Sequence, residues 1–224
     1  MNPDSPSHKR TVFLVDDHPL VREWLTNLIQ QQPDLVVCGE AESGPQARQA
    51  IVASRPNVAI VDISLKDSSG IELIKDLRQC CPQVAVLVLS MHEESHYAER
   101  ALRAGARGYI MKRETATKVI AAIRQVLEGR LYVGESLATS MAAQFVAGKT
   151  LATGSPAELL SDRELEVFEL LGKGRGTRQI AETLGVSIKT VQAYSARIKE
   201  KLGLSSATEL IREAVRWCEG ANQG

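Results

Sequence analysis

The sequence lacks any long apolar run. Across the 224 residues, no segment approaches the roughly 20 consecutive apolar residues that a membrane-spanning helix requires. Residues 1–10 are polar, and no apolar core of a signal peptide follows them. We therefore expect a cytoplasmic protein with no membrane partner, in which residues 1–10 form a flexible tail.

The sequence also has no net charge and no cysteine spacing typical of a metal site. Lys and Arg balance Asp and Glu at 27 each, so any attraction to nucleic acid must be local. The cysteines form no CxxC pair and have no histidine at a metal-ligand interval, which favours reduced thiols over a zinc site. Hydrophobic residues still make up 44% of the chain, as in ordinary globular proteins, so disorder throughout is excluded. The four cysteines are Cys38, Cys80, Cys81 and Cys218.

Residues 11–128 alternate between short apolar runs and stretches with helical spacing. Such alternation predicts an α/β fold, a five-stranded doubly wound parallel (βα)5 sheet of the flavodoxin-like type. Because crossover helices cover both faces of such a sheet, we expect its strands to be apolar throughout. The apolar runs are 12–15, 35–38, 58–61, 84–89 and 108–111, and helical spacing is clearest over 20–29, 71–77 and 119–127.

The rest of the chain has a different pattern. Residues 129–157 are rich in Gly, Ser and Thr and predict a linker, with room for a short helix near 135–147. From Leu159 onward the spacing is wholly helical, with no strand and no internal repeat. Ser161 followed by Glu164 is typical of a capping box. We expect an all-α domain of four helices over 158–220. Its helices are expected up to about 172 and over 177–185, 188–202 and 206–217.

Two adjacent acids end the first apolar run. Asp16 and Asp17 follow residues 12–15, and Asp62 follows the third run. In an open parallel sheet, ligands bind outside the carboxyl ends of the strands, so we expect all three carboxylates in one crevice. Three close acids stay ionised only where a cation neutralises them, and oxygen ligands suit Mg²⁺. The pattern therefore favours a magnesium site.

A hydroxyl and an ammonium group stand at the ends of the next two runs. Ser90 ends the fourth run, and Lys112 follows the fifth. Acids, a hydroxyl and a lysine around Mg²⁺ would form a site for a phosphoryl group, with a carboxylate as the nucleophile.

This order of groups resembles the receiver domain of two-component response regulators. Asp62 lies 45 residues after Asp17 and 50 residues before Lys112, as in that family. The resemblance implies that Asp62 accepts phosphate from a sensor histidine kinase. It also implies that Asp17, Asp62 and the backbone carbonyl of Ser64 bind Mg²⁺ directly, and that Asp16 holds a metal-bound water.

The same resemblance assigns a switch. Ser90 would move to bond the phosphoryl group, Tyr109 would swing inward behind it, and Lys112 would pair with the phosphate. The sequence departs from the family where Lys66 and Arg113 stand in place of common prolines. We expect these departures to affect loop conformation and phosphate lifetime more than the chemistry.

A helix-turn-helix is predicted near the C-terminus. A helix from Thr177 is followed by a turn at 185–187 and a longer helix from Ile188. Between 173 and 201 seven basic residues stand against two acidic ones, a local positive charge where phosphates would lie. The outer face of the longer helix is suited to a major groove. It carries Lys189, Thr190, Gln192, Ala193, Ala196, Arg197 and Lys199.

The stretch from LSDRELEV to KLGL resembles the LuxR/NarL-type DNA-binding domain. With the receiver pattern, the chain is similar to a NarL/FixJ-type response regulator. The resemblance implies that Gln192, Ala193 and Ala196 face bases of double-stranded DNA and that the other four residues face phosphates or groove edges. Gln192 suits adenine, whereas the two alanines offer apolar contact, for instance to thymine methyl groups.

The resulting hypothesis is a transcription regulator that phosphorylation of Asp62 switches and that forms a homodimer when phosphorylated or bound to DNA. It is not expected to be an enzyme beyond slow autodephosphorylation. A phosphatase that turns over Asp62 would require a second acid two residues on, where Ser64 stands. A receiver that only dimerises, without control by phosphate, is a further alternative. DNA affinity with and without a phosphodonor separates it from the main hypothesis.

Overall fold

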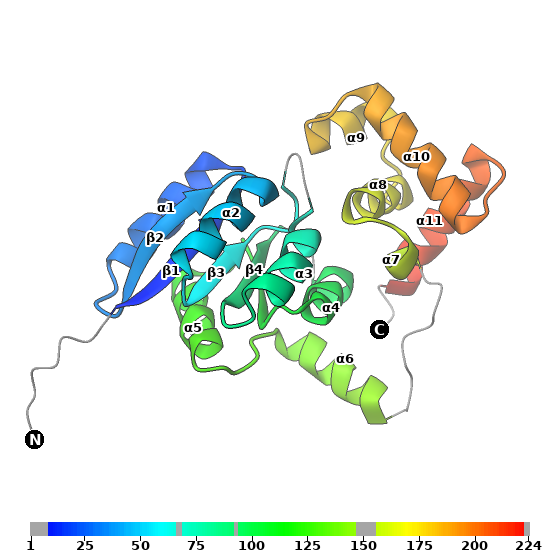
Figure 1. Ribbon diagram of the computed structural model, residues 1–224. Helices are drawn as coiled ribbons and strands as arrows, with labels where there is room; N and C mark the ends of the chain where they lie inside the picture. The colour runs from blue at the N-terminus through cyan, green and yellow to red at the C-terminus, as the bar shows by residue number, and fades with distance from the viewer. Residues whose placement is uncertain (1–8, 66–68, 92–93, 147–155, 222–224) are drawn as a thin grey trace, which may run out of the picture. The chain divides into compact units, whose positions relative to one another are not determined.

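The computed structural model describes residues 9–65, 69–91, 94–146 and 156–221 (Figure 1). The chain divides into two compact units, 1–138 and 139–224, and this division falls inside the expected linker. Most of the expected tail and the part of the linker over 147–155 lie outside the described residues. Within the described ranges, no helix is both long enough and apolar enough to cross a membrane.

The first unit contains a five-stranded parallel sheet with the strand order β2-β1-β3-β4-β5, which confirms the expected fold class. The order reverses at β1, so a ligand crevice is expected at the carboxyl ends of β1 and β3. Val15 at the end of β1 is level with Val61 at the end of β3. The residues that follow both strands therefore start from the same edge. The strands are β1 (Arg10–Val15), β2 (Leu35–Ala41), β3 (Val58–Val61), β4 (Ala85–Ser90) and β5 (Gly108–Met111).

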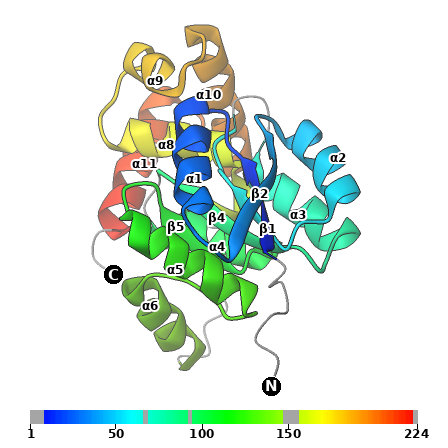
Figure 2. The ribbon, with the colours of Figure 1, turned by 90° about the vertical axis from the view of Figure 1, so that its left-hand side faces the viewer.

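Five helices cover the two faces of this sheet. Helices α1 and α5 pack on one face, and α2, α3 and α4 lie against one another on the other (Figures 1 and 2). Under α1 and α5, Leu25, Ile29 and Ile123 are buried against Leu14 of the central strand. The helices are α1 (Pro19–Gln30), α2 (Gly44–Ser54), α3 (Gly70–Cys80), α4 (Glu94–Ala104) and α5 (Ala116–Leu127).

The expectation that every strand is apolar and buried throughout is wrong for β2. Its burial alternates, and Val36, Cys38 and Glu40 are exposed. The reason is its place at the edge of the sheet, where the helices cover a strand less completely. β1 and β3, inside the sheet, are buried at every position from Val12 to Val15 and from Val58 to Val61.

The remaining helices follow in the order predicted, with one short addition. Helix α6 lies where room for a short helix was expected, and α8 packs against α10 and α11. The capping box is confirmed: Ser161 Oγ accepts from Glu164 N, and Glu164 Oε2 accepts from Ser161 N. The helices are α6 (Glu135–Val146), α7 (Pro156–Leu159), α8 (Asp162–Gly172), α9 (Thr177–Leu184), α10 (Ile188–Leu202) and α11 (Ala207–Ala221).

A buried acid joins α8 to α10. The side chain of Glu164 is 3% exposed, and Lys201 Nζ lies 2.6 Å from its Oε2. Burial by itself would raise the pKa of Glu164. The Lys201 ammonium and the hydrogen bonds from Ser161 outweigh burial, and the pKa lies below its usual value. This carboxylate therefore holds the fold of the helical unit in its charged form.

Candidate functional site

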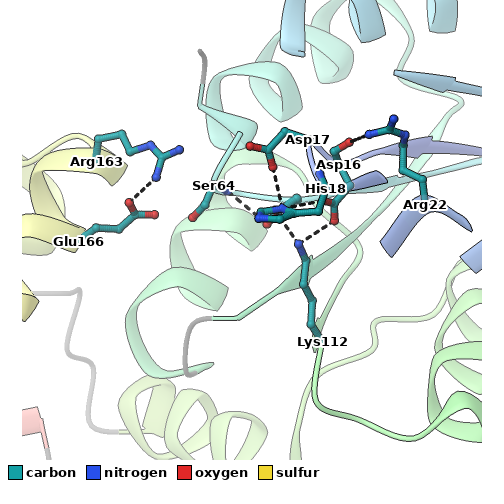
Figure 3. A network of polar contacts seen from close by, with 9 residues as sticks. Asp16, Asp17, His18, Arg22, Ser64, Lys112, Arg163 and Glu166 are labelled. Atoms are coloured by element: carbon teal, nitrogen blue, oxygen red, sulfur yellow. Dashed lines mark hydrogen bonds and ion pairs between the residues drawn. The ribbon is translucent and has the colours of Figure 1, made fainter. Parts of the chain in front are cut away.

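The structure brings the three predicted acids together at the carboxyl edge of the sheet. Side-chain ligand atoms of Asp16, Asp17, His18 and Asp62 all lie within 4.8 Å of one another (Figure 3). Asp16 and Asp62 are 2% and 3% exposed, so two like charges share a nearly dry site. Such a grouping costs free energy unless a cation neutralises it.

Lys112 provides one such cation. Its Nζ lies 2.7 Å from Asp16 Oδ2 and 2.7 Å from Asp62 Oδ2, with the lysine side chain 7% exposed (Figure 3). Burial would lower the pKa of Lys112, but the carboxylates of Asp62 and Asp16 outweigh it and raise the pKa. Burial raises the pKa of Asp62, and Asp16 adds to this, while Lys112 opposes it. One ammonium group therefore stabilises this carboxylate only in part.

The backbone after β3 is folded tightly around Asp62. Ser64 N donates to Asp62 Oδ1 at 3.2 Å, and Gly70 N donates to the Ile63 carbonyl at 2.9 Å. A Cβ on Gly70 would lie 2.2 Å from the Asp62 carbonyl oxygen, so only glycine permits this approach of α3. Gly70 is a residue of this site that the sequence did not predict. The expected metal-binding role of the Ser64 carbonyl stays a prediction.

Ser90 and Tyr109 lie on the neighbouring strands β4 and β5, and both are completely buried. The register pairs Ser90 with Met111, and Lys112 N donates to the Ser90 carbonyl at 2.7 Å. A movement of Ser90 would therefore bear directly on the backbone that carries Lys112. The inward swing of Tyr109 stays a prediction.

Two further residues at this pocket were not predicted from the sequence. His18 Nδ1 lies 2.9 Å from Asp17 Oδ1 and 3.1 Å from Asp16 Oδ1. The Arg22 guanidinium donates to the Asp16 carbonyl (Figure 3). Their positions in the sequence could have indicated these contacts, because His18 directly follows the acid pair and Arg22 lies one helical turn further along α1.

The donor set fits a divalent cation. Asp17 Oδ1 is enclosed and, by the geometry that a hydrogen bond requires, accepts none from the described residues. Carboxylate oxygens at this spacing are the ligands that Mg²⁺ takes. Asp16, Asp17 and Asp62 are thus able to hold such an ion beside Lys112.

The helix-turn-helix presents a second candidate site. Gly185 ends α9 in the left-handed region with φ 64°, and Ser187 caps α10 by accepting from Thr190 N at 3.1 Å. Val191 and Ile198 are buried on one face of α10. Of the seven predicted contact residues, Thr190 and Lys199 are half-buried and five are exposed. The exposed ones are Lys189, Gln192, Ala193, Ala196 and Arg197.

Comparison with known proteins identifies both units. Residues 12–124 match the response regulator receiver domain, and residues 158–214 match the luxR family of bacterial regulatory proteins. The chain is a response regulator of a two-component system. It is 36% identical over 209 residues to the oxygen regulatory protein NreC of Staphylococcus aureus, which covers 92% of this chain and 96% of that protein.

Solved structures agree with this membership. A LuxR-family response regulator from Aurantimonas sp. SI85-9A1 matches 62% of this chain and 99% of its own, with 32% identity and a TM-score of 0.57. RcsB from Salmonella enterica serovar Typhimurium, bound to the promoter rprA with the phosphomimetic BeF₃⁻, matches 92% of this chain and 98% of its own. Identity to RcsB is 25%, with a TM-score of 0.57. The predicted family and its LuxR-type helix-turn-helix are confirmed.

Proposed function

We propose that a sensor histidine kinase phosphorylates this response regulator on Asp62, with Mg²⁺ bound beside it, and that phosphorylation promotes DNA binding by α10. One observation carries the proposal: Asp62 is buried against Asp16 and Lys112 where β1, β3 and β5 end. A structural ion pair would require one acid and one base. Here three acids lie together, and one lysine contacts two of them, Asp16 and Asp62.

For the metal, Asp17, Asp62 and the Ser64 carbonyl are proposed as direct ligands, and Asp16 as the acceptor of a metal-bound water. The enclosed Asp17 Oδ1 supports this assignment, because it accepts no hydrogen bond from the described residues and its near neighbour is the His18 ring nitrogen at 2.9 Å. Mg²⁺ neutralises charge on the phosphoryl oxygens during transfer.

In the transfer step, a carboxylate oxygen of Asp62 attacks the phosphorus of the kinase phosphohistidine. The P–N bond breaks, its electron pair stays on the leaving imidazole, and an acyl phosphate remains on Asp62. The backbone N–H of Ser64 contacts Asp62 Oδ1, and the Lys112 ammonium contacts Asp62 Oδ2. Both hydrogen-bond donors are therefore beside the carboxylate before the reaction. Lys112 then pairs with a phosphoryl oxygen.

Loss of the phosphate is expected to be slow. Hydrolysis requires water to attack the phosphorus, and a phosphatase of the aspartate type uses a second acid two residues after its nucleophile. Ser64 occupies that position and offers no carboxylate. The protein is therefore proposed to store the phosphate and to dephosphorylate itself only slowly.

The phosphoryl group is proposed to draw the Ser90 hydroxyl toward Asp62, and Tyr109 to follow. Both side chains are completely buried on adjacent strands, so a movement of either requires its neighbours to repack. The change favours a form in which α10 is free and the chain dimerises on DNA. A population shift of this kind requires a few kcal/mol of differential binding.

On DNA, Gln192, Ala193 and Ala196 are proposed to face bases, and Lys189, Thr190, Arg197 and Lys199 to face phosphates or groove edges. Exposure of the first three and burial of Val191 behind them support this orientation. RcsB has been seen as dimers on DNA and on a promoter with a phosphomimetic, and we extend this behaviour to the present chain.

The direct test is intact mass after incubation with acetyl phosphate and Mg²⁺. Wild type should gain one phosphoryl group, lose it slowly on ageing, and gain none when EDTA removes the metal. Asp62→Ala should stay unmodified. Asp76→Ala, which removes an exposed acid on α3, is the matched control and should be phosphorylated like wild type. Unmodified wild type, with a kinase donor as well as acetyl phosphate, contradicts the proposal.

A further inference from the structure

A hollow lies at the edge of the receiver sheet opposite the acidic pocket. It has a volume of about 370 Å³, and it is lined by the ends of α3 and α4 and by residues that precede β4 and β5. Leu131, from the start of the expected linker, completes the lining among the described residues. Cavities that bind small molecules have volumes from about 300 Å³ upward, so this hollow has room for a small ligand.

The floor of the hollow is apolar. Ile74 and Val86 are 0% and 3% exposed, and Leu102, which also lines the hollow, is half-buried. Leu131 is 59% exposed and therefore forms part of the rim. A ligand with an apolar body would shield Leu131 from water when it binds, which favours binding.

Two arginines also line the hollow, and backbone contacts hold both in position. Arg78 Nη1 donates to the Arg103 carbonyl at 3.1 Å, and Arg107 Nη1 donates to the Gly129 carbonyl at 3.2 Å. Gly105 has φ 124°, and a Cβ there would lie 2.7 Å from Arg78 Cδ, so glycine leaves this place to the arginine. Both guanidinium groups are thus oriented before any ligand binds.

No acid neutralises these two guanidinium groups within the part of the chain that the structure describes. Their printed partners are carbonyl oxygens, and none of the described residues that line the hollow is acidic. Elsewhere on the receiver, Arg48 pairs with Asp76 and Arg124 pairs with Asp34. One carbonyl uses one of the five N–H groups of a guanidinium, so each arginine of the hollow keeps donors for an anion. A planar carboxylate matches this fork of donors.

We propose that this hollow binds a small organic carboxylate with an apolar body. Arg78 and Arg107 bind the carboxylate. The body packs on Ile74 and Val86, and Leu131 covers it at the rim. The inference is independent of the proposed function, because these residues belong neither to the acidic pocket nor to α10.

The ligand would also stabilise the start of the linker. Tyr132 N donates to the Arg107 carbonyl at 3.0 Å, and Tyr109 N donates to the Tyr132 carbonyl at 2.8 Å. Tyr132 also pairs with Gly108 as an isolated bridge, so this segment lies along the outer edge of β5. A ligand that contacts Arg107 and Leu131 should hold the segment on β5 and slow hydrogen exchange at the amides of Tyr109 and Tyr132.

The test is a titration of the full chain with hexanoate at constant ionic strength, followed by amide chemical shifts in NMR. Hexanoate should give saturable shifts at Gly105, Arg107 and Leu131, and it should slow hydrogen exchange at Tyr109 and Tyr132. Acetate has the charge without the body, and hexanamide has the body without the charge. Each should bind about tenfold more weakly than hexanoate.

Two variants assign the binding to the arginines. Arg78→Gln and Arg107→Gln should each weaken hexanoate binding about tenfold, because each removes a charged donor. Arg48→Gln, which removes an exposed arginine of α2, is the matched control and should bind hexanoate like wild type. An unchanged affinity in either hollow variant overturns the proposal. If a variant does not fold, the ligand series on wild type decides: absent shifts at the three amides, or equal affinity for hexanoate and hexanamide, overturn the proposal as well.

Discussion

The two units of this response regulator place charge in opposite ways. In the receiver unit the functional charges are buried, and Asp16, Asp62 and Lys112 are all at most 7% exposed. In the helical unit the buried acid Glu164 serves the fold, while the proposed DNA contacts such as Lys189 and Gln192 are exposed. Phosphoryl transfer gains from charges fixed in a dry site, whereas a polyanion must be reached from the surface.

The difference has a consequence for mutations. Because the functional charges of the receiver are buried, a substitution there should change both its function and its free energy of unfolding. In the helical unit, the buried acid Glu164 that serves the fold and the exposed residues proposed to bind DNA are different residues. The two tryptophans provide separate probes, because Trp24 lies on α1 and Trp217 on α11, where it packs edge-on to Phe168. Replacing either one with Phe leaves a reporter for the other unit.

The largest effect on stability is expected at Lys112. Lys112→Met leaves two buried carboxylates without their cation, and it should lower the free energy of unfolding of the receiver unit by about 3 kcal/mol in EDTA. Mg²⁺ should restore part of the loss. Urea denaturation followed by Trp24 fluorescence measures both effects. A loss below about 1 kcal/mol, with no recovery in Mg²⁺, would mean that the pocket is not a strained charge cluster.

The counterpart in the helical unit is Glu164. Glu164→Gln keeps an acceptor for Ser161 N but removes the ion pair with Lys201, at an expected cost of about 2 kcal/mol near neutral pH. Because folding lowers the pKa of Glu164, its contribution is present above the unfolded-state pKa and is lost as the pH falls through the folded-state pKa. The difference between variant and wild type, followed by Trp217 fluorescence, should therefore shrink in acid. A difference that is constant with pH would contradict a charge-based role.

Asp62 should behave in the opposite sense. Burial raises its pKa, so ionised Asp62 opposes folding at neutral pH. Asp62→Asn should stabilise the metal-free receiver by about 1 kcal/mol, since Asp16 still pairs with Lys112. The gain should vanish below the unfolded-state pKa of Asp62, where this carboxyl is neutral in both the folded and the unfolded protein. Thermal unfolding across pH, in EDTA and separately in Mg²⁺, measures the difference between variant and wild type. The variant should also lose most of the stabilisation that Mg²⁺ gives to wild type.

The smallest stability effect is expected on the outer face of α10. Lys189→Ala should change the free energy of unfolding by less than about 0.5 kcal/mol, yet it should reduce the salt dependence of DNA binding by about one phosphate contact. Arg212→Ala, which removes an exposed charge on α11, is the matched control. Equal salt slopes for both variants would place the DNA on another surface.

Much of the receiver could be predicted because its chemistry is tied to strand ends. Asp16, Asp62, Ser90 and Lys112 each lie at or after a strand, and parallel pairing brings such positions together without further information. The buried stripe of α10 was equally accessible, because Val191 and Ile198 follow helical spacing.

The rest depended on tertiary context. His18 and Arg22 contact the pocket through a turn whose geometry no residue pattern specifies. Gly70 is required by a close backbone approach between segments that only the folded chain brings together. The alternating burial of β2 follows from its place at the sheet edge, which strand composition alone does not reveal.

Control of DNA binding by phosphate on Asp62 is tested most directly by one comparison of DNA affinity. Wild type and Asp62→Ala are each measured on the same promoter DNA, at one salt concentration, before and after acetyl phosphate with Mg²⁺, with intact mass reporting the phosphorylated fraction. Affinity of wild type should rise about tenfold with phosphorylation, and that of Asp62→Ala should not change. Equal affinity of phosphorylated and unmodified wild type would contradict control by phosphate and favour a receiver that serves dimerisation alone.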